Sequence, residues 1–137
     1  GTARAIAFAL KSENSDVVVA NRSKERLSFF KERGFSTVVF DDLEIDGYDL
    51  IVNTTSAGLK DDLLPTKEAL LEGLMKKAAF AFDCIYRDTP FLKMADKFGV
   101  KRKDGIDMLL WQAFYAFEIF NDKKFDKKLF EVMKASI

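Results

Sequence analysis

A basic turn follows the first apolar strand of the chain. Residues 17–20 are typical of a buried β-strand, and they lead to Arg22 about twenty residues after Gly1, a glycine that opens a predicted helix. At this point of a dinucleotide-binding fold, a carboxylate accepts hydrogen bonds from a free ribose 2′-hydroxyl, whereas an arginine pairs with a 2′-phosphate. Arg26 lies close behind Arg22, and no carboxylate stands between the strand and Glu25. These residue types predict NADP as the cofactor and not NAD.

The residues around Arg22 fit an anion site at a helix entrance. Ser23 is predicted to cap a helix over residues 23–33 and to offer its hydroxyl there. Arg22 and Arg26 are four residues apart and can converge at this helix start, while Asn21 would hydrogen-bond the adenosine ribose or fix the turn. A solvated basic helix start is the alternative. Cations such as these arginines are unfavourable at the positive end of a helix dipole unless an anion binds beside them. Their presence therefore favours the binding site over the solvated helix start.

Two further groups of polar residues each follow a predicted strand: Thr54, Thr55 and Ser56, and the pair Cys84 and Tyr86. Ligands bind outside the carboxyl ends of the strands in open α/β sheets, so both turns are candidate binding segments. Any one of Thr54, Thr55 and Ser56 fits equally well as a small residue that only turns the chain after the strand. Cys84 fits an inert packing residue better than a nucleophile. Tyr86, taken alone, would fit a half-buried packing residue whose hydroxyl faces solvent.

Strands and helices alternate along the sequence. Strands are predicted at residues 17–20, 36–40, 49–53, 79–83 and near Val100. Helices are predicted at residues 1–10, 23–33, part of 66–76, from Thr89-Pro90 to Gly99, 106–120 and 126–135. Gly105, Met108 and Gln112 fall on one side of the helix at 106–120, opposite its apolar residues. The pattern predicts an α/β fold: a doubly wound, Rossmann-like parallel sheet with helices on both faces.

One element of that fold is absent from the pattern. A doubly wound nucleotide-binding sheet begins with a central strand that leads directly into the glycine turn, and Gly1 stands where that turn ends. We therefore expect the strands at 17–20 and 36–40 to lack a neighbour that joins them to the strands at 49–53 and 79–83. We also expect residues 1–137 to be one NADP-binding domain, incomplete at its N-terminus, from a longer protein.

Composition excludes several classes of function. Among 137 residues, 22 lysines and arginines balance 22 aspartates and glutamates, so no global field favours nucleic acid or an anionic membrane. The chain has no histidine and one cysteine, which removes histidine-assisted nucleophiles and makes a zinc site a poor prediction. No apolar run reaches the length of a membrane span. A single cysteine fits a reducing compartment, and we expect the cytoplasm.

Five motifs occur in order over essentially the whole chain: Gly1-Thr-Ala-Arg4-Ala, Asn21-Arg22-Ser23, Asn53-Thr-Thr-Ser-Ala-Gly58, Asp83-Cys-Ile-Tyr86 and Gly105-Ile-Asp-Met108-Leu-Leu-Trp-Gln112. Together they resemble the NADP-binding half of shikimate dehydrogenase, whose patterns at these points are roughly GxGGxxRA, NRT, NxTxxG, DxxY and GxxMLxxQ. The resemblance implies reversible reduction of 3-dehydroshikimate to shikimate with NADPH. It also implies a small-molecule substrate and leaves a homodimer open.

The resemblance assigns roles to individual residues. The pyrophosphate would lie at Gly1, Thr2 and Ala3, where the helix N-terminus supplies N–H groups. Thr54, Thr55 and Ser56 would border the cofactor, and the nicotinamide would contact Cys84, Gly105 and Met108. Tyr86 and Gln112 would contact the substrate. The family's catalytic lysine and aspartate belong to a separate substrate domain, so no catalytic residue is assigned in this chain.

The chain departs from the family pattern at two points in its own residues. Asp107 stands where family members often have glycine, and a carboxylate there could weaken cofactor binding. Only Arg87 and Asp88 separate Tyr86 from Thr89, without the usual proline. Two alternatives remain: a quinate/shikimate dehydrogenase that uses NAD, and a non-catalytic module that senses NADP. A preference for NADH would favour the first, and an upstream domain without the lysine and aspartate would favour the second.

Overall fold

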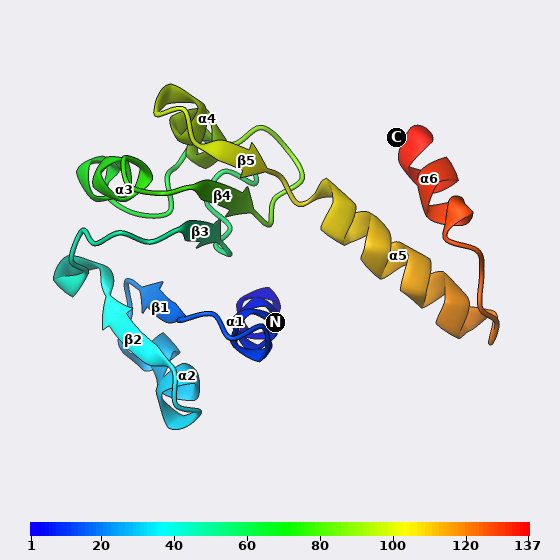
Figure 1. The fold of residues 1–137 in the computed structure, drawn as a ribbon, viewed down its shortest axis with the longest axis horizontal. Helices are drawn as coiled ribbons and strands as arrows, with labels where there is room; N and C mark the ends of the chain where they lie inside the picture. The colour runs from blue at the N-terminus through cyan, green and yellow to red at the C-terminus, as the bar shows by residue number, and fades with distance from the viewer.

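A computed structural model describes residues 1–137, and strands and helices alternate along it (Figure 1). The strands are β1 (Val18–Asn21), β2 (Ser36–Val39), β3 (Leu50–Asn53), β4 (Phe80–Asp83) and β5 (Lys101–Lys103). The α-helices are α1 (Thr2–Ser12), α2 (Ser28–Glu32), α3 (Glu68–Met75), α4 (Pro90–Lys97), α5 (Ile106–Phe120) and α6 (Lys128–Ala135). Two 3₁₀ turns, Glu25–Leu27 and Phe40–Asp42, follow β1 and β2. Every predicted element is present, and the predicted α/β fold is confirmed.

The strands form two separate parallel sheets. One contains β1 and β2, with Val18 opposite Ser36, and the other has the order β3–β4–β5, with Leu50 opposite Phe80. No strand joins β1 to β3, as the sequence predicted. In a doubly wound sheet with the order 3-2-1-4-5-6, the position between β1 and β3 belongs to the first strand.

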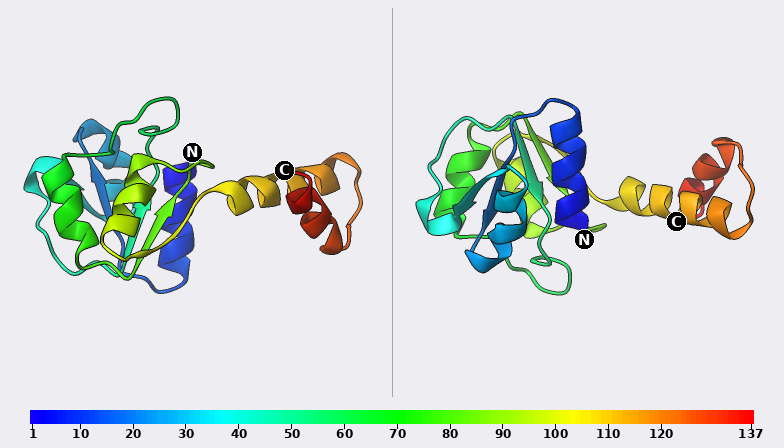
Figure 2. Two further views of the ribbon diagram at one scale, coloured as in Figure 1. Left: turned by 90° about the horizontal axis from the view of Figure 1, so that it is seen from above. Right: turned by 90° about the horizontal axis from the view of Figure 1, so that it is seen from below.

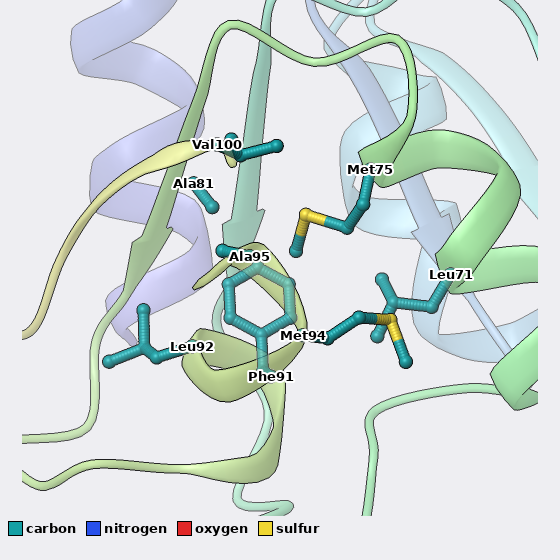
Figure 3. Close-up of a cluster of buried hydrophobic side chains, with 8 residues drawn as sticks. All are labelled: Leu71, Met75, Ala81, Phe91, Leu92, Met94, Ala95 and Val100. Carbon is teal, nitrogen blue, oxygen red and sulfur yellow. The ribbon is translucent and has the colours of Figure 1, made fainter. Parts of the chain in front are cut away.

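Helices cover the strands on both faces (Figure 2). Helices α1 and α2 lie on one face, and α3 and α4 lie on the other. The main core lies under α3 and α4, where eight buried apolar residues from α3, β4, α4 and the residue before β5 pack together (Figure 3): Leu71, Met75, Ala81, Phe91, Leu92, Met94, Ala95 and Val100. A smaller cluster on the α1 side contains Ala7, Phe30 and Phe35.

Helix α4 follows its predicted boundaries because both ends carry specific signals. Thr89 caps the N-terminus, where its Oγ1 accepts a hydrogen bond from the backbone N–H of Leu92 at 3.3 Å, and Pro90 occupies the first turn. Gly99 ends the helix with a φ of +68°, a conformation that glycine adopts without strain.

The helix predicted over residues 23–33 is shorter than expected, and its predicted cap was wrong. A 3₁₀ turn begins at Glu25, and the α-helix itself starts at Ser28. The side chain of Asn21 accepts a hydrogen bond from the backbone N–H of Ser23 at 3.0 Å. The hydroxyl of Ser23 donates to Glu25 at 2.6 Å instead of capping a helix. This turn holds the chain in a non-helical conformation until Lys24.

Helices α5 and α6 form a hairpin that projects from the α/β part of the molecule (Figures 1 and 2). Its own core contains Leu110, Phe114 and Phe130, and the rings of Trp111 and Phe130 stack with centroids 3.9 Å apart. Much of the predicted apolar face of α5 remains exposed, including Phe120, which is 88% exposed. None of the helices combines the length and the apolar run that crossing a bilayer requires.

Candidate functional site

The predicted binding segments gather at one edge of the strands. The strand pairs within each sheet are parallel, so the turns after β3 and β4 leave from the same edge of the three-stranded sheet. Figure 2 shows the N-terminus of α1 at the end of the molecule where the long loop after β3 also lies. This edge is where an open α/β sheet binds ligands.

A buried polar network lies at the carboxyl ends of β3 and β4. Asp83 is fully buried, and Asn53 is 3% exposed and pairs with it in the sheet register. The amide nitrogen of Asn53 donates to both carboxylate oxygens of Asp83 at 3.2 Å. The hydroxyl of Thr89, also fully buried, donates to Oδ2 of Asp83 at 2.6 Å, and the backbone N–H of Ile85 donates to Oδ1 at 3.0 Å. The carboxylate is therefore well satisfied without a cation.

Asn53 also holds the loop that follows β3. Its Oδ1 accepts hydrogen bonds from the backbone N–H of Thr55 at 3.0 Å and from the Thr55 hydroxyl at 2.8 Å. Thr55 Oγ1 in turn accepts from the N–H of Ala57 at 3.2 Å. Thr54 is half-buried, and Ser56 and Thr55 are exposed. The small residues of this loop thus both turn the chain and present hydroxyls at the ligand edge.

The turn after β4 is joined to the start of α5. The N–H of Gly105 donates to the carbonyl of Ile85 at 2.9 Å, and a Cβ at residue 105 would overlap the backbone of Cys84. Only glycine allows this close approach. Cys84 is half-buried, and burial raises the pKa of its thiol to about 11, so the thiol stays protonated and fits the predicted inert role.

The basic segment after β1 carries free cationic side chains. Arg22 and Arg26 are exposed, and neither makes an ion pair or a side-chain hydrogen bond within the chain. Because no helix begins at Ser23, the two arginines do not lie one turn apart on a helix as predicted. Asn21 fixes the turn through Ser23, one of the two roles predicted for it.

The N-terminus of α1 has no internal partner for its first N–H groups. Gly1 precedes the helix, no side chain caps it, and its first turn contains no acidic residue. A Cβ at Gly1 would meet no atom within 4 Å, so the backbone there is open to an approaching group. The amides of Thr2 and Ala3 lie in this first turn. Such a helix end attracts anions.

The residues predicted to contact substrate are both exposed. Tyr86 is 54% exposed, and Gln112 is exposed without a side-chain hydrogen bond. Met108 is half-buried in α5, which leads away from the strands (Figure 1). The structure therefore brings together the turn after β3, the turn after β4 and Gly105. No hydrogen bond or ion pair links Gly1, Arg22 or Gln112 to that group.

Asp107, which the sequence marked as a departure, is paired with two lysines. Lys103 Nζ lies 2.6 Å from Oδ2, and Lys134 Nζ from α6 lies 3.0 Å from Oδ1. Hydrogen bonds from Lys103 and then Lys134 hold the pKa of this carboxyl below its usual value. The charge is therefore neutralised locally, and the pairs connect β5, α5 and α6.

Sequence reasoning missed the structural role of Asp83 and Asn53. Each is the last residue of a short, mostly apolar strand, and the two strands are neighbours. Two polar residues at matching strand ends were therefore the available signal. Residue spacing could not reveal that Thr89, an expected helix cap, also donates to Asp83.

An apolar cleft separates β1 from β3. Its volume is about 460 Å³ on the α1 side, and 11 of its 17 lining residues are hydrophobic. Val18 and Ala20 of β1 line it opposite Leu50 and Val52 of β3. The lining of a second hollow, of about 160 Å³ on the α3 side, includes the same four residues. The gap between the two sheets is thus open on both faces.

Comparison with known sequences gives consistent relatives. Residues 105–137 match the family model for the shikimate 5'-dehydrogenase C-terminal domain. The chain is 41% identical over 136 residues to the NADP(+) shikimate dehydrogenase of Helicobacter hepaticus, covering 98% of this chain and 51% of that protein. It is 41% identical over 122 residues to the enzyme of the same name from Aquifex aeolicus, covering 88% and 44%. The chain spans about half the length of these relatives.

Solved structures agree with the sequences. A chorismate mutase/shikimate 5-dehydrogenase fusion protein from Clostridium acetobutylicum superposes with a TM-score of 0.83 at 33% identity, over 99% of this chain and 51% of that one. Shikimate 5-dehydrogenase from Thermus thermophilus, solved in complex with NADP(H) and shikimate, gives 0.76 at 31% identity, over 98% and 51%. In sequence and in fold, the chain is similar to about half the length of the shikimate dehydrogenases, and its residues 105–137 match their C-terminal domain.

Proposed function

We propose that this chain is the NADP-binding domain of a shikimate dehydrogenase, which reduces 3-dehydroshikimate to shikimate with NADPH. The observation that carries the proposal is Arg22, an exposed guanidinium without an internal partner at the carboxyl end of β1. A free arginine at that position suits a 2′-phosphate, and relatives are named for NADP(+).

The residues at the ligand edge fit the cofactor. The uncapped N-terminus of α1, with no acidic side chain in its first turn, would receive the pyrophosphate through the amides of Thr2 and Ala3. Arg22 and Arg26 would hold the 2′-phosphate. Thr54, Thr55 and Ser56 would line the cofactor, and Cys84, Gly105 and Met108 would border the nicotinamide. The bound cofactor supplies the hydride, and these residues bind and orient it.

The substrate would lie beyond the nicotinamide end. Tyr86 and Gln112 present a hydroxyl and an amide that are free of internal hydrogen bonds. An amide donates and accepts at once, which suits the neighbouring hydroxyls of shikimate. No acidic or basic side chain of this chain is proposed to move the proton. We assign that step to a lysine and an aspartate of a separate substrate domain.

The proposed domain is completed by one more strand. The apolar cleft between β1 and β3 lies where a doubly wound sheet has its first strand, and each flanking strand is the edge of a parallel sheet. We assign this place to a parallel strand of the intact protein that leads into Gly1. Its insertion would join the two sheets into one with the order β2–β1–new strand–β3–β4–β5.

Hydrogen exchange tests the inserted strand. Amides of β1 and β3 that point into the cleft should exchange fast in residues 1–137 alone and slowly in the intact protein. Strand β4 already lies between β3 and β5 and is the internal control, with similar protection in both samples. Equal exchange of β1 and β3 in the two samples would contradict the proposed strand.

The Arg22→Ala variant of the intact protein tests the cofactor. We expect binding of NADPH to weaken by about 1.5–3 kcal/mol, or roughly 10- to 100-fold, because a charge-assisted contact is lost. Binding of NADH, which lacks the 2′-phosphate, should change little. Lys31→Ala, which removes an exposed cation from α2, is the matched control. Equal losses for both cofactors would show that Arg22 does not read the 2′-phosphate.

Turnover separates the enzyme from a protein that only binds NADP. The intact protein should oxidise shikimate with NADP+ and produce NADPH absorbance, and Gln112→Ala should impair use of shikimate more than use of NADP+. Saturable NADPH binding without turnover would favour the sensing module. A wild-type preference for NADH would favour the NAD-dependent quinate/shikimate enzyme.

A further inference from the structure

We propose that Asp83 is a positioning residue for the cofactor site, an inference that rests on the proposed function. Its carboxylate touches none of the space that a cofactor would occupy, because it is fully buried. It instead joins three segments, of which the first two carry residues of the proposed cofactor site. These are the loop after β3, the turn after β4 and the N-terminus of α4, which follows that turn.

The four hydrogen bonds to Asp83 come from three different segments. Asn53 donates from the end of β3, Ile85 donates from the turn after β4, and Thr89 donates from the cap of α4. A carboxylate is the only side chain of this size that accepts at both ends without donating. An amide at this position would have to place an N–H₂ group against Thr89 or Asn53, which are both donors in the network.

The contacts continue from Asp83 to the proposed cofactor residues. Through Asn53 they reach Thr55, whose N–H and hydroxyl both donate to Asn53 Oδ1. Through Ile85 they reach Gly105, which donates to the carbonyl of Ile85 and packs against the backbone of Cys84. One buried carboxylate therefore sets the relative placement of Thr55, Cys84 and Gly105.

The orientation of Asn53 makes the network specific. Its Nδ2 faces Asp83 while its Oδ1 faces Thr55. If residue 83 became an amide, Asn53 would either oppose a donor or rotate its side-chain amide. Rotation would turn Nδ2 toward the N–H of Thr55 and release the loop. Loss of the charge at residue 83 is therefore expected to appear at residues 54–58, on a different strand.

The test uses the intact protein with three variants. Asp83→Asn removes the acceptor with little change of shape. The double variant Asp83→Asn with Asn53→Asp restores one carboxylate and one amide across the strands, with the carboxylate now facing Thr55. Asp42→Asn is the control, because Asp42 is exposed and makes no ion pair or side-chain hydrogen bond. Affinity for NADPH is measured by fluorescence, and loop opening by hydrogen exchange.

We expect Asp83→Asn to raise the Kd for NADPH about tenfold or more, since small displacements of binding groups are costly. Exchange at residues 54–58 should rise in the same variant, while β1 and β2 should be unchanged. The double variant should recover part of both effects, and Asp42→Asn should match the wild type. A folded Asp83→Asn protein with wild-type affinity and wild-type loop exchange would overturn the proposal.

Two further comparisons cover the cases in which Asp83→Asn does not fold or the wild-type protein does not bind NADPH. If Asp83→Asn does not fold, Thr89→Val and Thr89→Ser replace it. Valine removes both the donor to Asp83 and the cap of α4, and exchange at Leu92 reports the loss of the cap separately, whereas serine keeps both contacts. Raised exchange at residues 84–86 and weaker NADPH binding in the valine variant alone would support positioning, and equal behaviour would overturn it. A wild-type protein without saturable NADPH binding would refute the proposed function. The exchange measurements would still decide whether Asp83 holds the loops.

Discussion

The two sheets of the molecule differ in the size of the buried apolar cluster beside them and in the burial of the polar residues at their strand ends. The three-stranded sheet has eight buried residues in its main cluster, whereas the cluster beside the two-stranded sheet has three. At the ligand edge, Asn53 and Asp83 of the first are buried and hydrogen-bonded, but Arg22 of the second is exposed and unpaired. In the proposed cofactor site, one half is thus held in place by buried hydrogen bonds, whereas the other keeps an unpaired cation at the surface.

The smaller half relies on aromatic rings near the surface. Phe8 and Phe35 meet edge-to-face with centroids 5.2 Å apart, and Phe30 meets Phe35 at 5.8 Å. Arg4 and Arg33 lie over the ring of Phe29, at 3.7 and 3.6 Å from its centroid. Such contacts are individually small, and they pack α1 against α2 without a deep core.

Truncating one phenylalanine in each half should give the largest effect. Phe91→Ala is expected to cost about 3–5 kcal/mol of unfolding free energy, because Phe91 is 1% exposed within the larger cluster. Phe30→Ala should cost less, about 2–3 kcal/mol, because the smaller cluster collapses around the lost ring more easily. Urea unfolding followed by circular dichroism measures both. Phe8→Ala, at a ring that is 44% exposed, is the control. Equal costs for Phe91 and Phe30 would contradict the difference in packing between the two clusters.

A smaller effect should show how the helical hairpin is attached to the three-stranded half. Asp107→Asn removes the ion pairs to Lys103 and Lys134 and should destabilise the protein by roughly 1 kcal/mol at neutral pH. Thermal unfolding measures this loss. Glu131→Gln, at an exposed residue of α6, should have a smaller effect.

The pH dependence of that effect has a defined sign. The pKa of Asp107 is lowered in the folded protein, so its contribution is fully present above the unfolded value of about 4. The contribution is lost as pH falls through the lower folded pKa. The difference between wild type and Asp107→Asn should therefore shrink below about pH 4. A difference that stays constant down to pH 2 would exclude the ion pairs as its cause.

Local signals in the sequence predicted most of the fold. Thr89, Pro90 and Gly99 mark the ends of α4 with chemistry that belongs to the residues themselves, and the structure shows each in its expected place. The separation of β1 from β3 also followed from topology alone. Ser23 failed as a cap because Asn21 and Glu25 compete for its N–H and hydroxyl, a balance that propensity does not resolve.

The predicted site residues are placed by contacts that spacing does not encode. The hydrogen bond from Thr89 to Asp83 joins residues on different elements, and Asp107 meets Lys134 from a helix 27 positions away in the chain. Periodicity identified α5 correctly, but it could not say which side of its apolar face would be covered. Phe114 is buried against α6, while Phe117 and Phe120 remain exposed.

Because Gly105 packs directly against the backbone of Cys84, a tilt of α5 relative to the strands would begin at Gly105, at the ligand edge. The helix has 15 residues and is about 22 Å long at 1.5 Å per residue. A tilt of about ten degrees at Gly105 would move Gln112 by roughly 2 Å and the far end of the helix by about 4 Å. A methyl group added at residue 105 would therefore displace the far end of α5 more than the residues close to position 105.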